Sequence, residues 1–307
     1  MSVIARRCIV VTGAAGFLGA AVARLASEAG TDVLAVTRPG ADLRRLSGLS
    51  RVEHLNAESL ADPKLRVAIA ARKPEWFVHA AWRGVGGVDR EAPWQVAENL
   101  RMTMESVYLA QIVGCRHWVG IGSQAEYGPA HGPTVETYLP SPNTFYGMAK
   151  LAACQASRGL CAAAGLRWTW LRLYAIYGPS DSPRWFIPHV ISQLRLGAVA
   201  RLTACEQLWD YLYVDDAARA VLRVLDTQTC GLYNLGAGRP VSLRWVAEKL
   251  KAMIQSNGQL EFGSIPYKAD QLMHLEADIA KLVAHSGWKP EVGMEEGLLR
   301  TVRGGVH

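Results

Sequence analysis

The first half of the chain alternates short apolar runs with longer stretches of helical periodicity. Cys8–Thr12 is a continuous run of small apolar and β-branched residues, which is typical of a strand buried on both faces of a parallel sheet. Such alternation predicts an α/β fold, a doubly wound parallel sheet covered by helices on both faces. The pattern predicts strands at Cys8–Thr12, Asp32–Thr37, Val52–Asn56, Trp76–Ala80, His117–Gly122 and Arg167–Leu173, and helices at Gly16–Ser27, Trp94–Val113 and Tyr146–Ala164.

The pattern changes after Arg172. Pro179, Pro183 and Pro188 interrupt the alternation, and helices then mix irregularly with short strands. We therefore expect a first domain over residues 1–172 and a smaller, mixed α/β C-terminal lobe over residues 173–307. Some segments of the second half are expected to return to the first domain. A ligand cleft is expected where the lobe faces the carboxyl edge of the sheet.

Composition narrows the class of protein. Of the 307 residues, 50% are hydrophobic and 20% charged, which is ordinary for a soluble globular enzyme. The net charge of +6 is scattered rather than gathered into a stripe, so no nucleic-acid partner is expected. No apolar run is long enough to span a membrane. The cysteines form no CxxC pair and are interpreted as reduced, which fits a cytoplasmic protein, and the histidines show no metal-ligand spacing.

A glycine-rich turn, TGAAGFLG, follows the first predicted strand. Gly13 permits a tight turn, Gly16 lets the backbone approach a pyrophosphate, and Gly19 lets the helix pack close to the sheet. The predicted helix begins at Gly16, and its first turn, which includes Phe17 and Leu18, offers unpaired amides and a positive dipole end to the phosphates. A turn in this strand–helix context predicts a Rossmann domain that binds a dinucleotide.

The end of the second strand indicates which dinucleotide. An acidic residue there would bind the 2′-hydroxyl of NAD, but the chain has Thr37 and Arg38, with two further arginines at Arg44 and Arg45. Because arginine binds phosphate well, NADP(H) is expected to be preferred, with NAD(H) as the alternative. The competing interpretation of Arg38 is a solvated loop charge.

The fourth strand ends in His79-Ala80-Ala81. The small side chains of Ala80 and Ala81 should let the backbone approach the cofactor. His79 is interpreted as a packed structural residue. Asn99 is expected to hydrogen-bond to backbone near the cofactor, with a surface position as the alternative, and Trp82 to line the sugar pocket or to pack in the core.

Ser123, Tyr146 and Lys150 carry the predicted chemistry. Hydride transfer at a carbinol carbon requires a proton to move at its oxygen. A tyrosine can move this proton if its pKa falls toward neutrality, and a nearby ammonium group is expected to lower that pKa. Tyr146 and Lys150 lie four residues apart on a predicted helix and so share one face. Ser123 follows a strand, where its hydroxyl can bond to the substrate oxygen. Lys150 is also expected to hold the nicotinamide ribose.

Taken together, these motifs resemble the extended short-chain dehydrogenase/reductase family, in its nucleotide-sugar epimerase, dehydratase and reductase branch. The resemblance implies that the three glycines bind the cofactor and that Ser123, Tyr146 and Lys150 form the catalytic triad. It also implies a homodimer joined through two long helices of the first domain, and a substrate that carries a nucleoside diphosphate. The similarity runs nearly end to end and includes TGAAGFLG, VHAA, GSQAEYG, YGMAK, LRLYAIYGP, WDYLYVDDAARAV, YNLGAG and GWKPEVGMEEGL.

Departures from the family pattern narrow the choice of reaction. Gln124 and Ala125 stand where dehydratases of this branch carry an acidic pair, so dehydration is not expected. Ala175 stands where family members often have an asparagine, and Trp209 where they often have an arginine. In those members the asparagine and the arginine usually contact the substrate diphosphate. Glu126 is expected to order its loop. The candidate substrate contacts are Trp82, Gln124, Arg184 and Trp209. Arg184, Trp185 and Lys268 could replace the missing asparagine and arginine as contacts to the diphosphate. A surface or packing role is the alternative for each.

The leading prediction is an NADPH-dependent ketoreductase that acts on a nucleotide-linked 4-keto (deoxy)hexose. The second is an NAD-dependent nucleotide-sugar 4-epimerase, and the third is reduction of a carbonyl compound without a nucleotide, which Ala175 and Trp209 leave open. A redox-sensing or scaffold protein on the same fold is a fourth hypothesis, and the presence of the triad argues against it.

Overall fold

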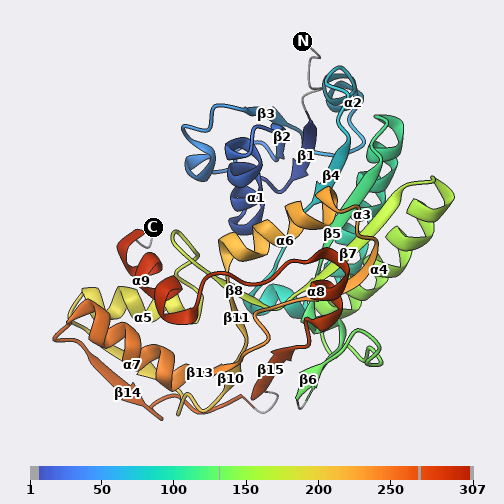
Figure 1. Cartoon of the computed structure of the whole chain (residues 1–307). Coiled ribbons are helices and arrows are strands. Elements are labelled where there is room, and N and C mark those ends of the chain that lie inside the picture. Colours follow the sequence, from blue (N-terminus) through green and yellow to red (C-terminus); the bar gives the residue numbers. More distant parts are fainter. Residues whose placement is uncertain (1–6, 131, 269–270, 305–307) are drawn as a thin grey trace.

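The computed structural model describes residues 7–130, 132–268 and 271–304. A parallel sheet of seven strands forms its centre, in the order β12-β7-β5-β4-β1-β2-β3 (Figure 1). The predicted α/β class and parallel sheet are confirmed. The seven strands are β1 (Cys8–Thr12), β2 (Asp32–Thr37), β3 (Val52–Asn56), β4 (Trp76–His79), β5 (His117–Ser123), β7 (Arg167–Leu173) and β12 (Gly231–Leu235).

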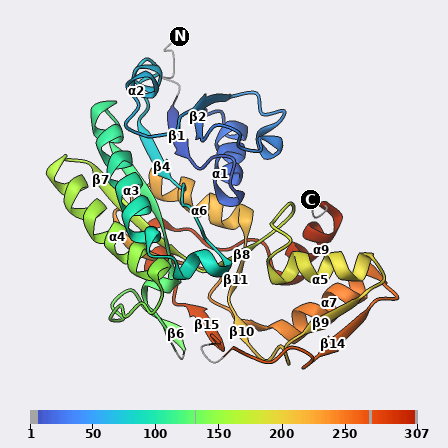
Figure 2. The same cartoon turned by 180° about the vertical axis from the view of Figure 1, so that it is seen from behind.

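Helices cover both faces of this sheet, as strands that are apolar on both sides require. In β1, Ile9 and Val11 face α1 (Phe17–Glu28) and α6 (Val214–Asp226). The intervening Cys8 and Val10 face the layer of α2 (Pro63–Ala70), α3 (Trp94–Ile112) and α4 (Phe145–Ala163). The alternation along one strand therefore builds two cores, and the long helices α3 and α4 lie side by side in both views (Figures 1 and 2).

The second half of the chain also contributes to this sheet. β12 pairs in parallel with β7 and forms the edge beyond it, with Leu235 opposite Leu173. α6 precedes β12 and packs on the same face as α1, and α8 (Ala280–Ser286) places Leu282 in the same core. These segments come after residue 172 but lie within the sheet's own layers.

A smaller group of elements forms a separate core around α5 (Phe186–Arg195), α7 (Leu243–Ile254) and α9 (Met294–Gly304). It gathers at one end of the molecule, beside the carboxyl ends of the central strands (Figure 2). The other strands in the described part of the chain are short. They are β6 (Pro133–Thr134), β8 (Ala175–Tyr177), β9 (Val199–Leu202), β10 (Leu208–Trp209), β11 (Tyr211–Tyr213), β13 (Val241–Ser242), β14 (Gln259–Phe262) and β15 (His274–Ala277).

Three short 3-10 turns follow strands near this end of the sheet: η1 (Arg44–Leu46), η2 (Gly87–Glu91) and η3 (Gln124–Glu126). The predicted strand Trp76–Ala80 ends one residue earlier than expected, at His79, because Ala80 already belongs to the segment that turns toward the glycine loop. Across the described ranges 7–130, 132–268 and 271–304, no helix is long and apolar enough to cross a membrane.

Candidate active site

The glycine turn between β1 and α1 packs against the segment that follows β4. Gly13 has a φ of +68°, and a Cβ at this position would lie only 2.6 Å from the backbone nitrogen of Ala81. A Cβ on Gly19 would overlap the carbonyl oxygen of Gly13. Both positions therefore exclude any larger residue, and the turn presents bare backbone at the carboxyl end of β1.

The N-terminus of α1 opens directly from this turn. Its N-cap is Gly16, which has no side chain to accept a hydrogen bond from the first turn of the helix. The amides of Phe17 and Leu18 therefore remain at the positive end of the helix without an intrahelical partner. Bare glycine backbone and an uncapped helix end fit the pyrophosphate of a dinucleotide.

The side chains at and after the end of β2 differ in whether they already have hydrogen-bond or ion-pair partners. Thr37 is buried and donates a hydrogen bond to Oδ1 of Asn56 at 3.1 Å. Arg44 is paired with Asp42 at 2.6 Å, and Arg45 donates to the carbonyl oxygens of Ala15 and Ser180 at 3.2 and 2.6 Å. Arg38 is exposed, and its guanidinium has no hydrogen-bond or ion-pair partner within the described part of the chain.

His79 and Asn99 are structural neighbours of the site. His79 is buried between Thr12, at 2.9 Å from its Nδ1, and Thr103, and burial lowers its pKa to about 3, so the imidazole is neutral. Asn99 is fully buried. Its amide accepts from the backbone nitrogen of Arg83 at 2.9 Å and donates to the carbonyl oxygen of the same residue at 3.1 Å. Asn99 thus holds the segment after β4 against α3.

Ser123 is the last residue of β5 and the N-cap of η3. Its Oγ accepts a hydrogen bond from the amide of Ala125 at 3.2 Å, while the side chain of Glu126 accepts from the Ser123 backbone amide at 2.9 Å. This reciprocal capping box fixes the serine at the end of the strand. Because the Ser123 oxygen is already an acceptor, its hydroxyl hydrogen is available for another partner.

Glu126 holds the end of β5 in place through buried hydrogen bonds. Its carboxylate is fully buried and accepts from Nε of Arg172 at 2.7 Å and from the indole of Trp170 at 2.9 Å. The Arg172 guanidinium in turn lies over the ring of Tyr127, with Cζ 4.2 Å from its centroid. The carboxylate nearest to Ser123 in sequence is therefore committed to a buried ion pair.

Lys150 reaches back from α4 to the end of β5. Its Nζ donates to the carbonyl oxygen of Ile121 at 2.6 Å and lies 3.6 Å from the ring centroid of Trp82. The indole of Trp82 is held in turn by Gln95 at 3.0 Å. Burial lowers the pKa of Lys150 to about 7, against the opposite effect of Glu126. Trp82 thus lies against both Lys150 and Tyr146, with its ring centroid 6.0 Å from that of the tyrosine.

Tyr146 lies one turn before Lys150, in the first turn of α4, which Thr144 caps through the amide of Gly147 at 3.0 Å. The tyrosine is only 7% exposed. Burial raises its pKa, while the charge of Arg90 and a hydrogen bond with Ser123 act in the opposite direction. The expected fall of this pKa toward neutrality is therefore wrong for this structure, because burial has the largest effect and raises the pKa. At neutral pH Tyr146 is a protonated phenol beside the serine hydroxyl.

The glycine turn, the uncapped helix end and the serine–tyrosine–lysine cluster thus meet at the carboxyl edge of one parallel sheet. The family model "NAD dependent epimerase/dehydratase family" matches residues 9–236 of the chain, which include all of these elements. The chain belongs to the NAD dependent epimerase/dehydratase family. The resemblance inferred from the sequence motifs is confirmed, and the chain is an NAD(P)-dependent enzyme of this family.

Similar proteins within this family cover nearly the whole chain. The chain is 27% identical over 306 residues to a UDP-glucuronate 4-epimerase of Thermodesulfobacterium geofontis, covering 95% of this chain and 94% of the relative. It is 28% identical over 322 residues to GDP-L-fucose synthase 1 of Arabidopsis thaliana, covering 95% and 91%. A UDP-glucose 4-epimerase of Thermotoga maritima, solved with UDP-glucose, superimposes with a TM-score of 0.86 at 25% identity, over 97% of this chain and 98% of that one.

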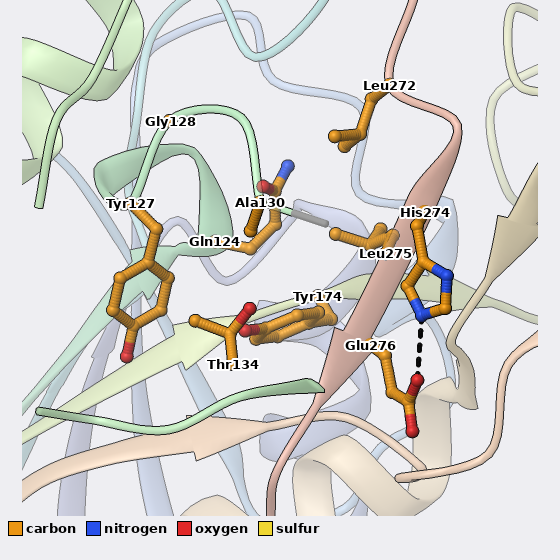
Figure 3. A pocket seen from close by; sticks show the side chains of 10 residues that line it. All are labelled: Gln124, Tyr127, Gly128, Ala130, Thr134, Tyr174, Leu272, His274, Leu275 and Glu276. Atoms are coloured by element: carbon orange, nitrogen blue, oxygen red, sulfur yellow. Dashed lines mark hydrogen bonds and ion pairs between the residues drawn. The ribbon is translucent and has the colours of Figure 1, made fainter. Parts of the chain in front are cut away.

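The residues expected to bind the substrate fall into two groups. Gln124 lines a small pocket with Tyr174 and His274, and His274 is bonded to Glu276 at 2.7 Å (Figure 3). Trp209, on β10, donates its indole hydrogen to the carbonyl oxygen of Leu272, another residue of that pocket, at 3.2 Å. Gln124 therefore lines the same pocket as Leu272, the hydrogen-bond partner of Trp209.

Arg184 lies elsewhere, exposed in the loop before α5, with Trp185 at the start of that helix. Trp185 is close to Gly86, where a Cβ would lie 2.9 Å from its ring. The α5 loop of the smaller lobe thus packs against the loop that follows β4. Lys268 lies beside residues 269–270, which are outside the described part of the chain.

The sequence alone did not single out Arg90. This residue lies on η2, and its Cζ is 4.2 Å from the ring centroid of Tyr146. The loop carries no motif, and the charge of Arg90 is the only feature of the sequence that could have drawn attention to this residue. For Glu126, by contrast, the spacing Ser-x-x-Glu was a usable capping-box signal.

Proposed function

We propose that this protein is an NADPH-dependent ketoreductase that acts on a nucleoside-diphosphate-linked 4-keto (deoxy)hexose. The observation that carries the proposal is the buried phenol of Tyr146, whose pKa is raised by burial, next to the Ser123 hydroxyl. A phenol that keeps its proton at neutral pH is the proton donor that a ketone reduction needs. The nucleotide sugars named for the relatives support the substrate class.

Each residue of the site has a distinct role in this reaction. The dinucleotide, when bound, supplies the hydride. Tyr146 donates its phenolic proton to the keto oxygen, and Ser123 donates a hydrogen bond to the same oxygen and polarises the carbonyl. Lys150 binds the nicotinamide ribose, and Gly13, Gly16 and Gly19 receive the pyrophosphate. Glu126 is buried in its pair with Arg172, so this carboxyl group is not expected to protonate a leaving hydroxyl in a dehydration.

The preference for NADPH is assigned to Arg38. Arg44 and Arg45 are engaged by Asp42 and by two carbonyl oxygens, whereas Arg38 is exposed at the end of β2. A charge-assisted hydrogen bond to phosphate contributes about 1.5–3 kcal/mol. We therefore expect Arg38→Ala to weaken NADPH binding by about 10- to 100-fold and to leave NADH binding nearly unchanged.

Fluorescence titration of the emptied protein with both cofactors measures this effect. Arg44→Ala, which breaks an exposed ion pair with Asp42, is the matched control and should change the ratio of the two affinities less than threefold. Equal losses for NADPH and NADH in Arg38→Ala would assign the arginine to the surface rather than to the 2′-phosphate.

An NAD-dependent 4-epimerase is the second candidate, and the similarity to two epimerases favours it. An epimerase retains its dinucleotide, because the same hydride must return to the opposite face of the sugar. The cofactor content of the purified protein separates the two functions. Protein that arrives empty and prefers NADPH by more than tenfold supports the ketoreductase. Stoichiometric NAD released on denaturation would replace it by the epimerase.

Reduction of a carbonyl compound without a nucleotide is the third candidate. Ala175 and Trp209 favour it, since both lack the polar group that usually contacts a diphosphate. Competition experiments decide between the two substrate classes. Inhibition of keto-sugar reduction by a free nucleoside diphosphate supports the nucleotide-linked substrate, and its absence supports the third candidate.

We also infer a homodimer joined through α3 and α4. The two helices pack against each other over the sheet and expose Tyr108 and Ile112 on α3 and Met148 on α4. Light scattering should give about twice the monomer mass of 33.4 kDa. A monomeric mass at micromolar concentration would contradict the inference.

A further inference from the structure

The loop between β4 and α3 brings a second cation to Tyr146. Arg90 lies on η2, and its Cζ is 4.2 Å from the centroid of the tyrosine ring, within the range of a cation–π contact. Its Nη1 donates to the carbonyl oxygen of Val85 at 3.3 Å, which fixes the guanidinium in this position. Arg90 is half-buried, so the contact is partly shielded from water.

This loop is fastened to α3 at several points. Gln95 donates its amide hydrogens to the carbonyl oxygens of Gly84 and Asp89, and Asn99 bonds to both backbone groups of Arg83. Both side chains are fully buried. Buried amides therefore hold the loop that carries Arg90 in addition to its surface contacts, so the arginine is presented to the tyrosine by a well-supported loop.

The charged and polar groups that face Tyr146 come from four elements. Arg90 approaches from η2, the Ser123 hydroxyl from β5 and the Glu126 carboxylate from η3. Lys150, on α4 itself, lies 5.9 Å from the ring centroid, farther than Arg90, and its ammonium is directed to Ile121 and Trp82. Glu126 is neutralised by Arg172. Arg90 is thus the cation closest to the tyrosine ring.

Arg90 and Lys150 also differ in how constantly they are charged. Burial lowers the pKa of Lys150 to about 7, so the charge of the lysine depends on pH near neutrality. A guanidinium remains charged at every pH at which the protein is folded. The constant positive charge beside Tyr146 is therefore that of Arg90.

We propose that Arg90 is a positioning residue for proton transfer, which holds the ring of Tyr146 and stabilises the phenolate that forms when the proton leaves. This inference rests on the proposed function. In the reduction, the hydride goes to the keto carbon, the phenolic proton goes to the keto oxygen, and Tyr146 is left as phenolate until water returns a proton. A guanidinium over the ring is attracted more strongly to the phenolate than to the phenol.

The test is the titration of Tyr146 in Arg90→Met, followed as the ultraviolet absorption of tyrosinate. The titration curve of each protein is compared with that of the same protein carrying Tyr146→Phe. The difference between the two curves is the signal of Tyr146 alone. Loss of the cation should move the titration upward by about one pH unit. Arg90→Lys, which keeps a cation near the ring, should restore at least half of the shift. This measurement needs no substrate, so its outcome is independent of whether the protein is a ketoreductase.

Arg83→Met is the matched control. Arg83 lies in the same loop and makes the same kind of contact, but with Trp94, at 4.9 Å from its centroid. The Arg83→Met substitution should leave the pH at which Tyr146 titrates unchanged. With keto sugar, the alkaline limb of the pH–rate profile of Arg90→Met should move upward by the same pH unit, because the reaction needs the protonated phenol.

An unchanged titration in Arg90→Met would overturn the proposal. So would a raised KM together with an unchanged pH profile, since that result would place Arg90 on the substrate rather than on the tyrosine. If Arg90→Met does not fold, Arg90→Lys and Arg90→Gln carry the same comparison, and equal titrations in these two variants would also contradict it.

Discussion

Tyr146→Phe is expected to lower kcat for ketone reduction by about 1,000-fold, because it removes the proton donor and leaves the ring in place. The ring contacts to Trp82 and Arg90 do not involve the hydroxyl, so the fold and the affinity for NADPH should stay close to those of the unaltered protein. Steady-state reduction of a 4-keto nucleotide sugar, followed by NADPH absorbance, measures the loss.

Tyr108→Phe is the control for this substitution. Tyr108 is 46% exposed on α3, and the loss of its hydroxyl should leave kcat within twofold. If Tyr146→Phe retains more than a tenth of the activity, Tyr146 is not the proton donor. Full retention of function together with dinucleotide binding would favour the redox-sensing alternative.

Of the variants proposed for this protein, Glu126→Gln is expected to lower the free energy of unfolding most. The side chains of Glu126 and Arg172 are 0% and 2% exposed, so the substitution leaves a guanidinium charge buried without its counter-ion. Removal of one partner of a buried pair typically costs about 3–5 kcal/mol. Because the same carboxylate caps the backbone of Ser123, activity per folded molecule should also fall. Denaturant unfolding measures the first effect.

Two further variants make this prediction specific. Glu98→Gln breaks the exposed pair with Arg83 and should cost less than about 1 kcal/mol. The double variant Glu126→Gln/Arg172→Met removes the unpaired charge and should recover part of the lost stability. A Glu126→Gln protein as stable as Glu98→Gln would show that the buried pair contributes little.

The sequence predicted the central sheet well because its strands carry their own signal. β1 and β2 have the predicted bounds, because a strand that is covered on both faces needs a continuous apolar run, and such a run is recognisable where turns or loops end it. The glycine turn is also local, because a positive φ at Gly13 and the clash at Gly19 dictate the residue type.

The smaller lobe was less predictable. Strands such as β10 and β13 have two residues each, too few to show a period, and they exist because partners far along the chain pair with them. The same holds for the supports of the site. Glu126 and Arg172 are 46 positions apart, and no feature near either residue indicates the other.

For the site itself, sequence spacing brought Tyr146 and Lys150 to one helix face but did not show what surrounds them. Trp82 follows β4 and stacks on Lys150, and Arg90 reaches Tyr146 from a loop without any motif. These contacts are set by how the β4–α3 loop folds over α4, which depends on buried amides from α3. Side-chain environments of this kind arise from tertiary packing.

One measurement tests the proposed ketoreductase function most directly: single-turnover reaction of the purified protein with a 4-keto-6-deoxy nucleotide sugar and NADPH that carries deuterium at the transferring position. We expect one NADPH to be oxidised for each sugar reduced, and mass spectrometry to find one deuterium on the new carbinol carbon. A 4-keto sugar left without deuterium and without oxidation of NADPH, by protein that releases bound NAD on denaturation and interconverts the two 4-hydroxyl epimers of a nucleotide sugar, would contradict the proposal and identify an epimerase.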